Sequence, residues 1–220
     1  QQCIVAKLDL MFIEVDKQIN FIQKKLNNVS VFVNQFMSSI KEDAVKLEDI
    51  VQIKTGKLDA NAMVEGGKYP FFTCSKKIFY IDTFAFDCDA VLLAGNNASG
   101  DFNVKHYTGK FNAYQRTYII TVKAINKLRL RYLYFQLTQA LSKFKTMSVG
   151  TNTKFLKLGM IKNFEIPLPS LKQQDAILEK LKILEQNLEL LSRNTLLQKD
   201  NYSKLKSSIL RQELKQNDAA

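Results

Sequence analysis

Two runs of regularly spaced apolar residues, one at each end of the chain, constrain the fold of this 220-residue sequence most strongly. Within residues 173–215 the apolar positions alternate at intervals of four and three residues, which is the spacing of a coiled-coil seam. This seam consists of Ile177, Leu181, Leu184, Leu188, Leu191, Thr195, Gln198, Tyr202, Leu205 and Ile209. The same spacing, with one stutter, occurs near the start of the chain at Ile4, Leu8, Met11, Val15, Ile19, Ile22, Leu26, Val29, Val33, Phe36 and Ile40. We therefore predict two long helices on either side of a different kind of middle.

The two runs also resemble each other residue by residue. Residues 1–8 match residues 174–181 at the first, fourth, seventh and eighth positions, and Ser38-Ser39-Ile40 matches Ser207-Ser208-Ile209. A repeated helix around a unique middle indicates a larger pattern in which helices and domains alternate. Two amphipathic helices rich in Leu, Lys and Gln can also align in this way by chance, so the repeat alone does not decide the fold.

The middle of the chain contains short apolar stretches rich in β-branched and aromatic residues, separated by Gly and Asn turns. We predict strands at 69–73, 78–81, 90–93 and 116–122, a helical turn leading into a strand at 47–54, a turn at 56–57, a helix at 127–145, a polar loop at 150–154, and a last short strand or turn at 158–166. The apolar run 90–93 is expected to be buried on both faces of a sheet.

These patterns predict an α+β protein, with a compact mixed α/β domain carried on two long antiparallel coiled-coil helices. The helices are expected to be antiparallel because one must enter the domain and the other must leave it from the same side. The first helix is expected to end near Ile40, and Pro167 and Pro169 hold the chain extended before the second begins. The predicted boundaries are a first helix at 1–42, a domain at 43–170, a second helix at 171–216 and a disordered tail at 217–220.

The net charge of +11 is concentrated in the middle of the chain. Residues 45–170 contain 18 Lys and Arg against nine Asp and Glu, whereas residues 1–44 are neutral and residues 171–220 carry only +2. Clustered Lys and Arg bind polyanions by displacing condensed counterions, so nucleic acid is the simplest partner. A lysine-rich composition without DNA binding would give the same excess, and charge alone does not separate the two.

Composition is typical of a folded protein in a reducing compartment. The hydrophobic fraction of 46% and the charged fraction of 24% are ordinary for a globular domain. The cysteines Cys3, Cys74 and Cys88 are odd in number and lack zinc-site spacing, so we expect reduced thiols and no metal. No apolar run approaches the roughly 18 residues that cross a bilayer, and no secretory signal is visible, so we expect a cytoplasmic location and no membrane partner.

The sequence contains no recognisable catalytic motif. His106 is the only histidine and no Gly-x-Ser-x-Gly turn accompanies it, so a histidine-based triad is not predicted. The glycine spacing at 95–100 is that of a phosphate loop, but the Lys and the Ser or Thr of such a loop do not follow. Asp82, Asp87 and Asp89 lack the further residues of a nuclease metal site. We expect a non-catalytic protein without a cofactor, in which His106 is satisfied within the fold or lies at the surface.

The order of several short motifs along the chain resembles one known family. The motifs are Gly56, Tyr69-Pro70-Phe71-Phe72-Thr73-Cys74-Ser75, Asp89-Ala90-Val91-Leu92-Leu93-Ala94-Gly95, Phe111-Asn112-Ala113-Tyr114-Gln115-Arg116, Gly150-Thr151-Asn152-Thr153-Lys154, and Ile166-Pro167-Leu168-Pro169 followed by Gln173-Gln174. In this order, and flanked by the repeated helix, they are similar to the specificity subunit of type I restriction-modification systems over essentially the whole chain. The chain departs from the full-length pattern in having one recognition domain, so it resembles the second half of such a subunit or a half-size form.

The resemblance implies a function in DNA recognition. In that family, each target-recognition domain reads one half of a split site and the long helices set the distance between the halves. The implied partners are double-stranded DNA, methyltransferase subunits docked on the helices, a restriction subunit reached through the complex, and a second copy of the chain as a further option. About 40 helical residues reach about 60 Å, against 34 to 36 Å for one turn of DNA, which suits a spacer.

Phosphate contacts and base contacts are expected from different residues of the middle domain. The phosphate candidates are lysines in or near the predicted loops: Lys54, Lys57, Lys76, Lys77, Lys105, Lys110 and Lys154. The side chains with planar groups that can read base edges are Arg116 toward guanine and Asn96, Asn97, Asn112, Gln115 or Asn152 toward adenine. Gly95, Gly100 and Gly150 would let these loops approach a duplex closely. Each polar residue could equally be a solvated loop position, and the aromatic residues Tyr69, Phe71, Phe72, Phe111 and Tyr114 are expected in the core.

Two other functions are consistent with the sequence. A coiled-coil scaffold with a protein-binding head would show no salt-dependent affinity for DNA. The recognition region of a fused type II restriction enzyme would be preceded by a methyltransferase glycine motif and an Asn-Pro-Pro-Tyr element.

Overall fold

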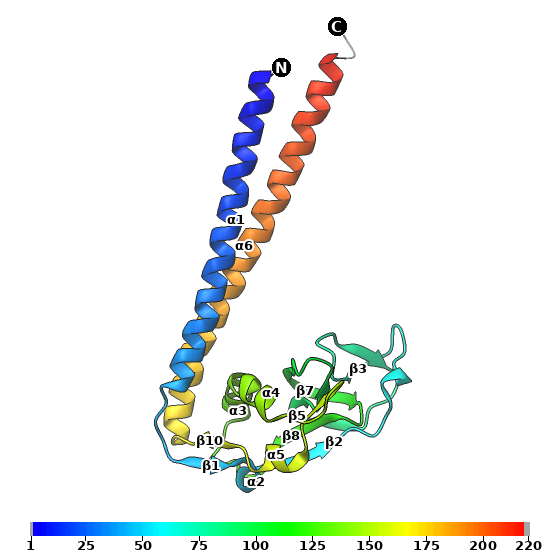
Figure 1. Ribbon diagram of the computed structural model, residues 1–220, viewed down its shortest axis with the longest axis vertical. Helices are drawn as coiled ribbons and strands as arrows, with labels where there is room; N and C mark the ends of the chain where they lie inside the picture. Colours follow the sequence, from blue (N-terminus) through cyan, green and yellow to red (C-terminus); the bar gives the residue numbers. More distant parts are fainter. Residues whose placement is uncertain (1, 218–220) are drawn as a thin grey trace. The chain divides into compact units, whose positions relative to one another are not determined.

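The computed structural model describes residues 2–217, although the side chains of some positions in the two long helices lie outside the described part. Contacts divide the chain into two compact units. One unit comprises the residues up to Gln35 and those from Lys180 onward, and the other is Phe36–Glu179. The first unit is built from the long helices α1 (Gln2–Ser38) and α6 (Leu171–Asn217), which run in opposite directions within it (Figure 1).

The described side chains of α6 follow the predicted seam for several turns. Leu181 is buried, and Leu184 and Leu188 are half-buried, but Leu191 and Gln198 are exposed. Part of the prediction lies outside the described side chains, namely Ile4, Leu8, Met11, Val15, Ile22, Leu26, Val29, Tyr202, Leu205 and Ile209, as do Cys3 and the match at Gln1. Residues 218–220 of the predicted tail also lie outside the described part, whereas Asn217 ends α6.

The second unit contains a mixed sheet of six strands. In the order of the sheet the strands are β2 (Val51–Thr55), β8 (Thr117–Val122), β5 (Phe86–Ala94), β7 (Val104–Ala113), β3 (Tyr69–Phe72) and β4 (Phe79–Ile81). Only β3 and β7 pair in parallel, and the other neighbours are antiparallel. Two short ladders complete the unit: β1 (Ala44–Lys46) with β10 (Glu165–Pro167), and β6 (Asn96–Asn97) with β9 (Lys154–Phe155).

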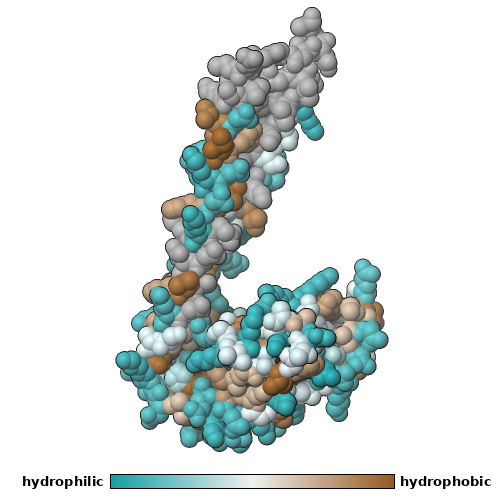
Figure 2. Space-filling model, in the orientation of Figure 1, coloured by the Kyte–Doolittle hydropathy of each residue, from teal (hydrophilic) through white to brown (hydrophobic). Residues whose placement is uncertain are grey.

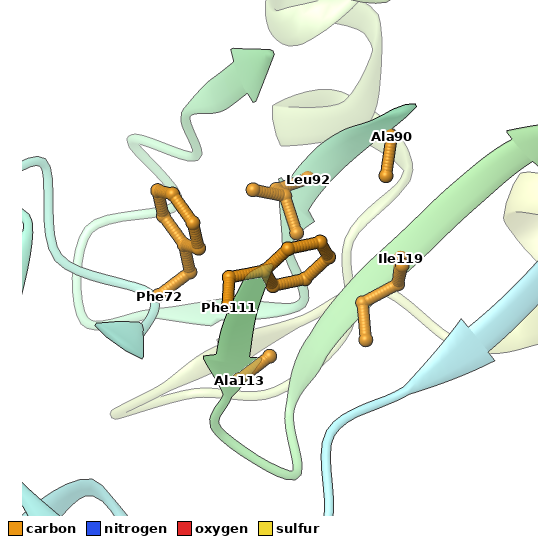
Figure 3. Close-up of a cluster of buried hydrophobic side chains, with 6 residues drawn as sticks. All are labelled: Phe72, Ala90, Leu92, Phe111, Ala113 and Ile119. Atoms are coloured by element: carbon orange, nitrogen blue, oxygen red, sulfur yellow. The ribbon is translucent and has the colours of Figure 1, made fainter. Parts of the chain in front are cut away.

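One face of the large sheet holds an aromatic core (Figure 3). Its buried members are Phe72, Ala90, Leu92, Phe111, Ala113 and Ile119. The Phe111 ring lies at the centre, because its centroid is 5.6 Å from that of Phe72, 5.2 Å from that of Phe86 and 5.8 Å from that of Tyr107. Phe71 is also buried, so three of the five expected core aromatics are in the core, while Tyr69 and Tyr114 are half-buried.

The helix α3 (Leu130–Gln139) packs on β5 and β7. It contacts the opposite face of the sheet, because its Arg131 guanidinium lies 3.4 Å from Nδ1 of His106, whose side chain points away from the aromatic core. With both faces covered, Ala90 to Ala94 are all buried, which confirms the burial predicted for this run. The predicted helix at 127–145 is in fact two, since Ala140 ends α3 and precedes α4 (Leu141–Met147).

Other elements differ from the sequence-based expectation. The ten-residue strand β7 is not predicted, because Lys105, Lys110 and a central Gly109 at φ +125° weaken its strand pattern. The last segment was expected to be a strand or turn, but Leu158–Lys162 forms the helix α5, and only β10 is extended. The predicted helical turn and strand at 47–54 are confirmed as α2 (Leu47–Ile50) followed by β2, and a 3₁₀ turn, η1, covers Ala60–Ala62.

The start of α6 is fixed by a capping box. The Ser170 amide donates to Oε1 of Gln173 at 2.9 Å, and the Gln173 amide lies 3.4 Å from Oγ of Ser170. The side-chain nitrogen of Gln173, Nε2, donates to Oε1 of Glu42 at 2.9 Å. Gln173 therefore both caps its own helix and joins it to the segment that follows α1.

Gln174 ties the same helix to the loop before α3. It is fully buried, its Oε1 accepts from the Arg129 amide at 2.8 Å, and its Nε2 donates to the carbonyls of Lys127 at 2.7 Å and Pro169 at 2.8 Å. Arg129 and Asp175 add a bidentate ion pair at 2.8 and 2.9 Å. This pair raises the pKa of Arg129 and lowers that of Asp175. The motif Gln173-Gln174 thus has a structural explanation.

Candidate nucleic-acid interface

The turn between β7 and β8, residues 114–116, is the meeting point of several distant segments. The Gln115 amide donates to the Leu58 carbonyl at 2.9 Å. The Arg116 carbonyl accepts from the Gly95 amide at 2.8 Å and from Sγ of Cys74 at 3.3 Å. The segments that contain residues 57, 74 and 95 therefore end beside the same turn. We refer to this part of the domain, together with the segments 76–77, 96–105 and 145–155, as the loop end.

The short ladder of β6 and β9 adds the predicted polar loop to the loop end. Asn96 pairs with Phe155, and Asn97 pairs with Lys154. A bridge between Val149 and Phe155 closes the loop that contains Asn152. The guanidinium of Arg116 is exposed, and its Cζ lies 5.2 Å from the ring centroid of Phe155, so an aromatic ring supports a group that can read a base.

Ten of the twelve residues predicted to contact DNA lie in or beside the loop end. They are Lys57, Lys76, Lys77, Asn96, Asn97, Lys105, Gln115, Arg116, Asn152 and Lys154. Lys54 lies on the edge strand β2, opposite Ile119. The further phosphate candidate Lys110 lies on β7, with its Nζ 4.7 Å from the ring centroid of Phe84. Sequence positions far apart are thus gathered into one polar surface, and hydrophilic side chains project around the rim of the unit in Figure 2.

Asn112 does not belong to this surface, contrary to the expectation from the sequence. Its side chain is only 5% exposed, its Oδ1 accepts from the Ala113 amide at 3.0 Å, and its Nδ2 lies 3.4 Å from the Thr83 carbonyl. Asn112 is buried because β7 lies inside the sheet, between β5 and β3. Gly95 also has an internal role, since a Cβ there would lie 2.4 Å from the Arg116 carbonyl oxygen. Its lack of a side chain allows two protein segments to approach each other.

Asn97 holds the shape of its own loop. Its Oδ1 accepts from the Ser99 amide at 2.9 Å and from the Asp101 amide at 3.0 Å, and it also lies 3.0 Å from Oγ of Ser99. Such Asx turns are typical of Asn before a Ser-Gly segment. In Gln115 the side-chain amide is also engaged, donating to Oδ1 of Asp59 at 2.6 Å, but both groups are exposed. Among the described side chains, those of Asn96 and Asn152 make fewer hydrogen bonds within the fold than that of Asn97.

Lys105 is an internal anchor. Its Nζ donates to the Ser75 carbonyl at 2.6 Å and to Oδ1 of Asn103, while Nδ2 of Asn103 donates to the Cys74 carbonyl at 2.7 Å. Burial lowers the pKa of the Lys105 ammonium. Lys105 and Asn103 together hold the segment that precedes Lys76 and Lys77.

An ion pair at the loop end was not predicted from the sequence. Nζ of Lys145, in the last turn of α4, lies 2.6 Å from Oδ1 of Asp101, and Oγ of Ser99 donates to Oδ2 of Asp101 at 3.1 Å. The hydrogen bond from Lys145, followed by that from Ser99, lowers the pKa of Asp101. The sequence feature that could have indicated this pair is Lys145 itself, a lysine near the end of a helix and shortly before the loop that contains Gly150.

His106 is satisfied within the fold, as expected. Its Nε2 lies 2.7 Å from Oδ1 of Asp89, which also accepts from Oγ1 of Thr108 at 2.7 Å. Within residues 2–217 as described, no group of three His, Cys, Asp or Glu side chains could hold a metal. Cys74 and Cys88 are free thiols, and burial raises the pKa of Cys88.

The long helices carry a second candidate surface. Ile183, Leu190 and Leu197 follow one another at heptad intervals on α6 and are 51%, 59% and 56% exposed. On α1, Leu10, Ile13 and Val31 are exposed as well, and apolar side chains are visible along the long helices in Figure 2. Among the described residues, no helix has both the length and the apolar composition needed to cross a membrane.

Comparisons with known proteins agree on one family. The model of the type I restriction modification DNA specificity domain matches residues 40–198. The chain is 43% identical over 145 residues to the type I restriction enzyme EcoDI specificity subunit of Escherichia coli, which covers 66% of this chain and 31% of that protein.

Solved structures share the fold. The S subunit of a type I restriction-modification system from M. genitalium gives a TM-score of 0.61 at 20% identity, covering 70% of this chain and 42% of that one. The HsdS subunit from Thermoanaerobacter tengcongensis gives a TM-score of 0.60 at 16% identity, and the match covers 96% of this chain and 57% of that one. A chain from a structural study of type I R-M complex assembly and conformational transition gives a TM-score of 0.70 at 17% identity, and the match covers 96% of this chain and 58% of that one. The chain thus spans less than two thirds of the length of each of these relatives.

Proposed function

Because the chain belongs to the type I restriction-modification DNA specificity family, we propose that residues 43–170 form a target-recognition domain that binds one half of a bipartite site in double-stranded DNA. The observation that carries the proposal is the loop end, where the β7–β8 turn and the β6–β9 ladder gather basic and planar polar side chains from distant segments. A surface of this composition supplies both sequence-independent affinity and base reading.

The structure suggests different roles for the predicted residues. Arg116, Asn96 and Asn152 are proposed to read base edges, with Gln115 joining them once it releases Asp59. Phosphate contacts are proposed for Lys57, Lys76, Lys77 and Lys154, which lie in or beside the loop end, and for Lys54 on the edge strand β2. Asn97 and Lys105 act as positioning residues for the segments that they hold, and Asn112 is not retained.

The long helices, residues 1–42 and 171–216, are proposed to act as spacer and docking surface for methyltransferase subunits. The exposed heptad of Ile183, Leu190 and Leu197 supports this role, since an apolar stripe at this spacing fits the apolar face of a partner helix. Methylation and cleavage would then be carried out by partner subunits in the cytoplasm, with the restriction subunit joining through the complex. The chain itself would be non-catalytic.

The proposal can be tested by co-expressing the chain with the methyltransferase subunit of its host operon and mapping adenine methylation in the host DNA. Asn152→Ala should change or relax one half of the methylated motif, because an amide that reads adenine is worth about 1–3 kcal/mol of discrimination. Asn126→Ala is the matched control, since Asn126 is an exposed amide in the loop before α3. It should leave the motif unchanged.

Two outcomes would contradict the proposal. If the chain neither forms a complex with the methyltransferase subunit nor binds duplex DNA at low salt, the scaffold function is favoured instead. If Asn152→Ala, Asn96→Ala and Arg116→Ala all leave the methylated motif unchanged, the loop end is not the reading surface. Docking is tested separately with Leu190→Glu, which should weaken co-purification, against Gln198→Glu, which adds the same charge at an exposed polar position of α6.

A further inference from the structure

The ion pair of Lys145 and Asp101 lies at the edge of the loop end. The two side chains are 53% and 59% exposed, and the ammonium and carboxylate are 2.6 Å apart. The pair joins α4 to the loop between β6 and β7. That loop is held from within by Asn97, so the carboxylate is presented in a fixed position.

Two lysines flank this loop from the same direction. At Gly100, with φ +75°, a Cβ would lie 3.2 Å from Cγ of Lys145 and 3.4 Å from Cγ of Lys154. Lys76 also contributes to the lowered pKa of Asp101, so its charge acts at the same point. Positive side chains from three separate segments therefore lie at this loop: Lys145 and Lys76 act on the Asp101 carboxylate, and Lys154 lies beside Gly100. The local charge stays positive after the ion pair forms.

We propose that Lys145 binds a DNA phosphate and that Asp101 occupies the ammonium of Lys145 in the absence of DNA. The inference rests on the proposed DNA-binding function of the loop end. Carboxylate and phosphate oxygens make the same kind of charge-assisted hydrogen bond with an ammonium group. A phosphate can therefore take the place of the carboxylate with no change in the position of α4.

A DNA phosphate can replace the Asp101 carboxylate because the ion pair is exposed to solvent. Exposed ion pairs are weak and are screened by salt, so the Lys145 ammonium is readily released to a competing anion. A duplex adds the free energy of counterion release, which the carboxylate cannot supply. Asp101 in turn repels DNA that approaches without reaching Lys145. The lysine thereby fixes the position of the duplex on the domain, and the carboxylate lowers the affinity for every DNA that binds there.

Affinity for a short fluorescent duplex of arbitrary sequence, measured by anisotropy over a salt series with the full chain, tests the inference. Lys145→Gln should reduce the slope of log affinity against log salt by about 0.9, the value for one lost phosphate contact. Asp101→Asn should raise the affinity about two- to fivefold, the range expected from releasing an exposed ion pair. In the Lys145→Gln background the gain from Asp101→Asn should be smaller.

Matched variants separate this role from general charge and from folding. Lys143→Gln removes the same charge from an exposed position of α4, and Asp82→Asn neutralises an exposed carboxylate after β4. Neither should reproduce the change in slope or the coupling between the two sites. If Lys145 only stabilises the end of α4, Lys145→Gln will lower the melting temperature and leave the salt slope unchanged, which overturns the inference. Failure of the unaltered chain to bind any duplex at low salt would instead overturn the proposed function together with the inference.

Discussion

Tyr132 makes the free energy of unfolding of the domain fall at alkaline pH. The side chain is fully buried, its hydroxyl donates to the Pro167 carbonyl at 3.0 Å, and it accepts from Nε2 of Gln136 at 2.7 Å. Burial raises its pKa to about 12, from an ordinary value near 10. Because Pro167 belongs to β10, just before α6, the hydroxyl also stabilises the segment that leads into the long helix.

The direction of the pH effect follows from which state binds the proton. Between about pH 10 and 12 the unfolded chain loses the Tyr132 proton while the folded chain keeps it, so stability is present below the unfolded pKa and falls as pH rises. A difference of about two pKa units corresponds to about 2.7 kcal/mol, at 1.36 kcal/mol per unit. Tyr132→Phe removes this titration. It also leaves the Pro167 carbonyl and the Gln136 amide without their partner, at a cost of about 1–3 kcal/mol.

The two effects oppose each other, so the comparison of wild type with Tyr132→Phe gives a sharp test. At pH 8 the variant should be less stable in urea unfolding followed by circular dichroism. Its deficit should shrink from about pH 10 upward, by at most about 2.7 kcal/mol, since only the wild type loses stability through this group, and a deficit smaller than this loss should reverse at the alkaline end. Other tyrosines and lysines titrate in both proteins and cancel in the difference. A deficit that stays constant from pH 8 to 12 would refute the reasoning.

Two substitutions test the other internal anchors. Gln174→Leu should reduce the free energy of unfolding by about 3 kcal/mol in urea, because it removes three hydrogen bonds that a fully buried side chain makes to the backbone, at about 1 kcal/mol each, whereas Gln186→Leu at an exposed position of α6 should change it little. Gly95→Ala should destabilise the domain by about 2 kcal/mol or more, as its Cβ would meet the Arg116 carbonyl, and a normal melting temperature would contradict this close approach. Gly159→Ala is the control, since a Cβ there meets no atom within 4 Å.

Features set by neighbouring residues were predictable from the sequence. The long helices follow from the spacing of apolar residues, and the burial of Val91 to Leu93 follows from an uninterrupted apolar run. The capping box at Ser170 and Gln173 and the Asx turn at Asn97 also have local signals, although only the presence of a boundary and a loop was inferred from them. Local patterns thus predict the kind of element and the approximate position of the loops.

Features set by long-range pairing were not predictable. The strand β7 has a poor strand pattern and exists because β5 and β3 supply partners on both sides, which buries Asn112. Lys105 looked like a phosphate contact because a surface lysine and an anchoring lysine have the same sequence signal. Its contacts with Ser75 and Asn103 depend on the pairing that brings these segments together. Lys145 was missed for the same reason, since its partner Asp101 is 44 residues away.

Anchoring residues and reading residues should consequently respond differently to substitution. Lys105→Met removes hydrogen bonds that hold the segment from Cys74 to Lys77, so we expect a lower melting temperature with the same methylated motif. Asn152→Ala should have the converse effect, a changed motif with a melting temperature near that of the wild type, because its loop position is exposed. Measuring both properties for both variants separates the two classes. If Lys105→Met changes the motif at unchanged stability, Lys105 reads or binds DNA directly, and the division between anchors and readers at the loop end is wrong.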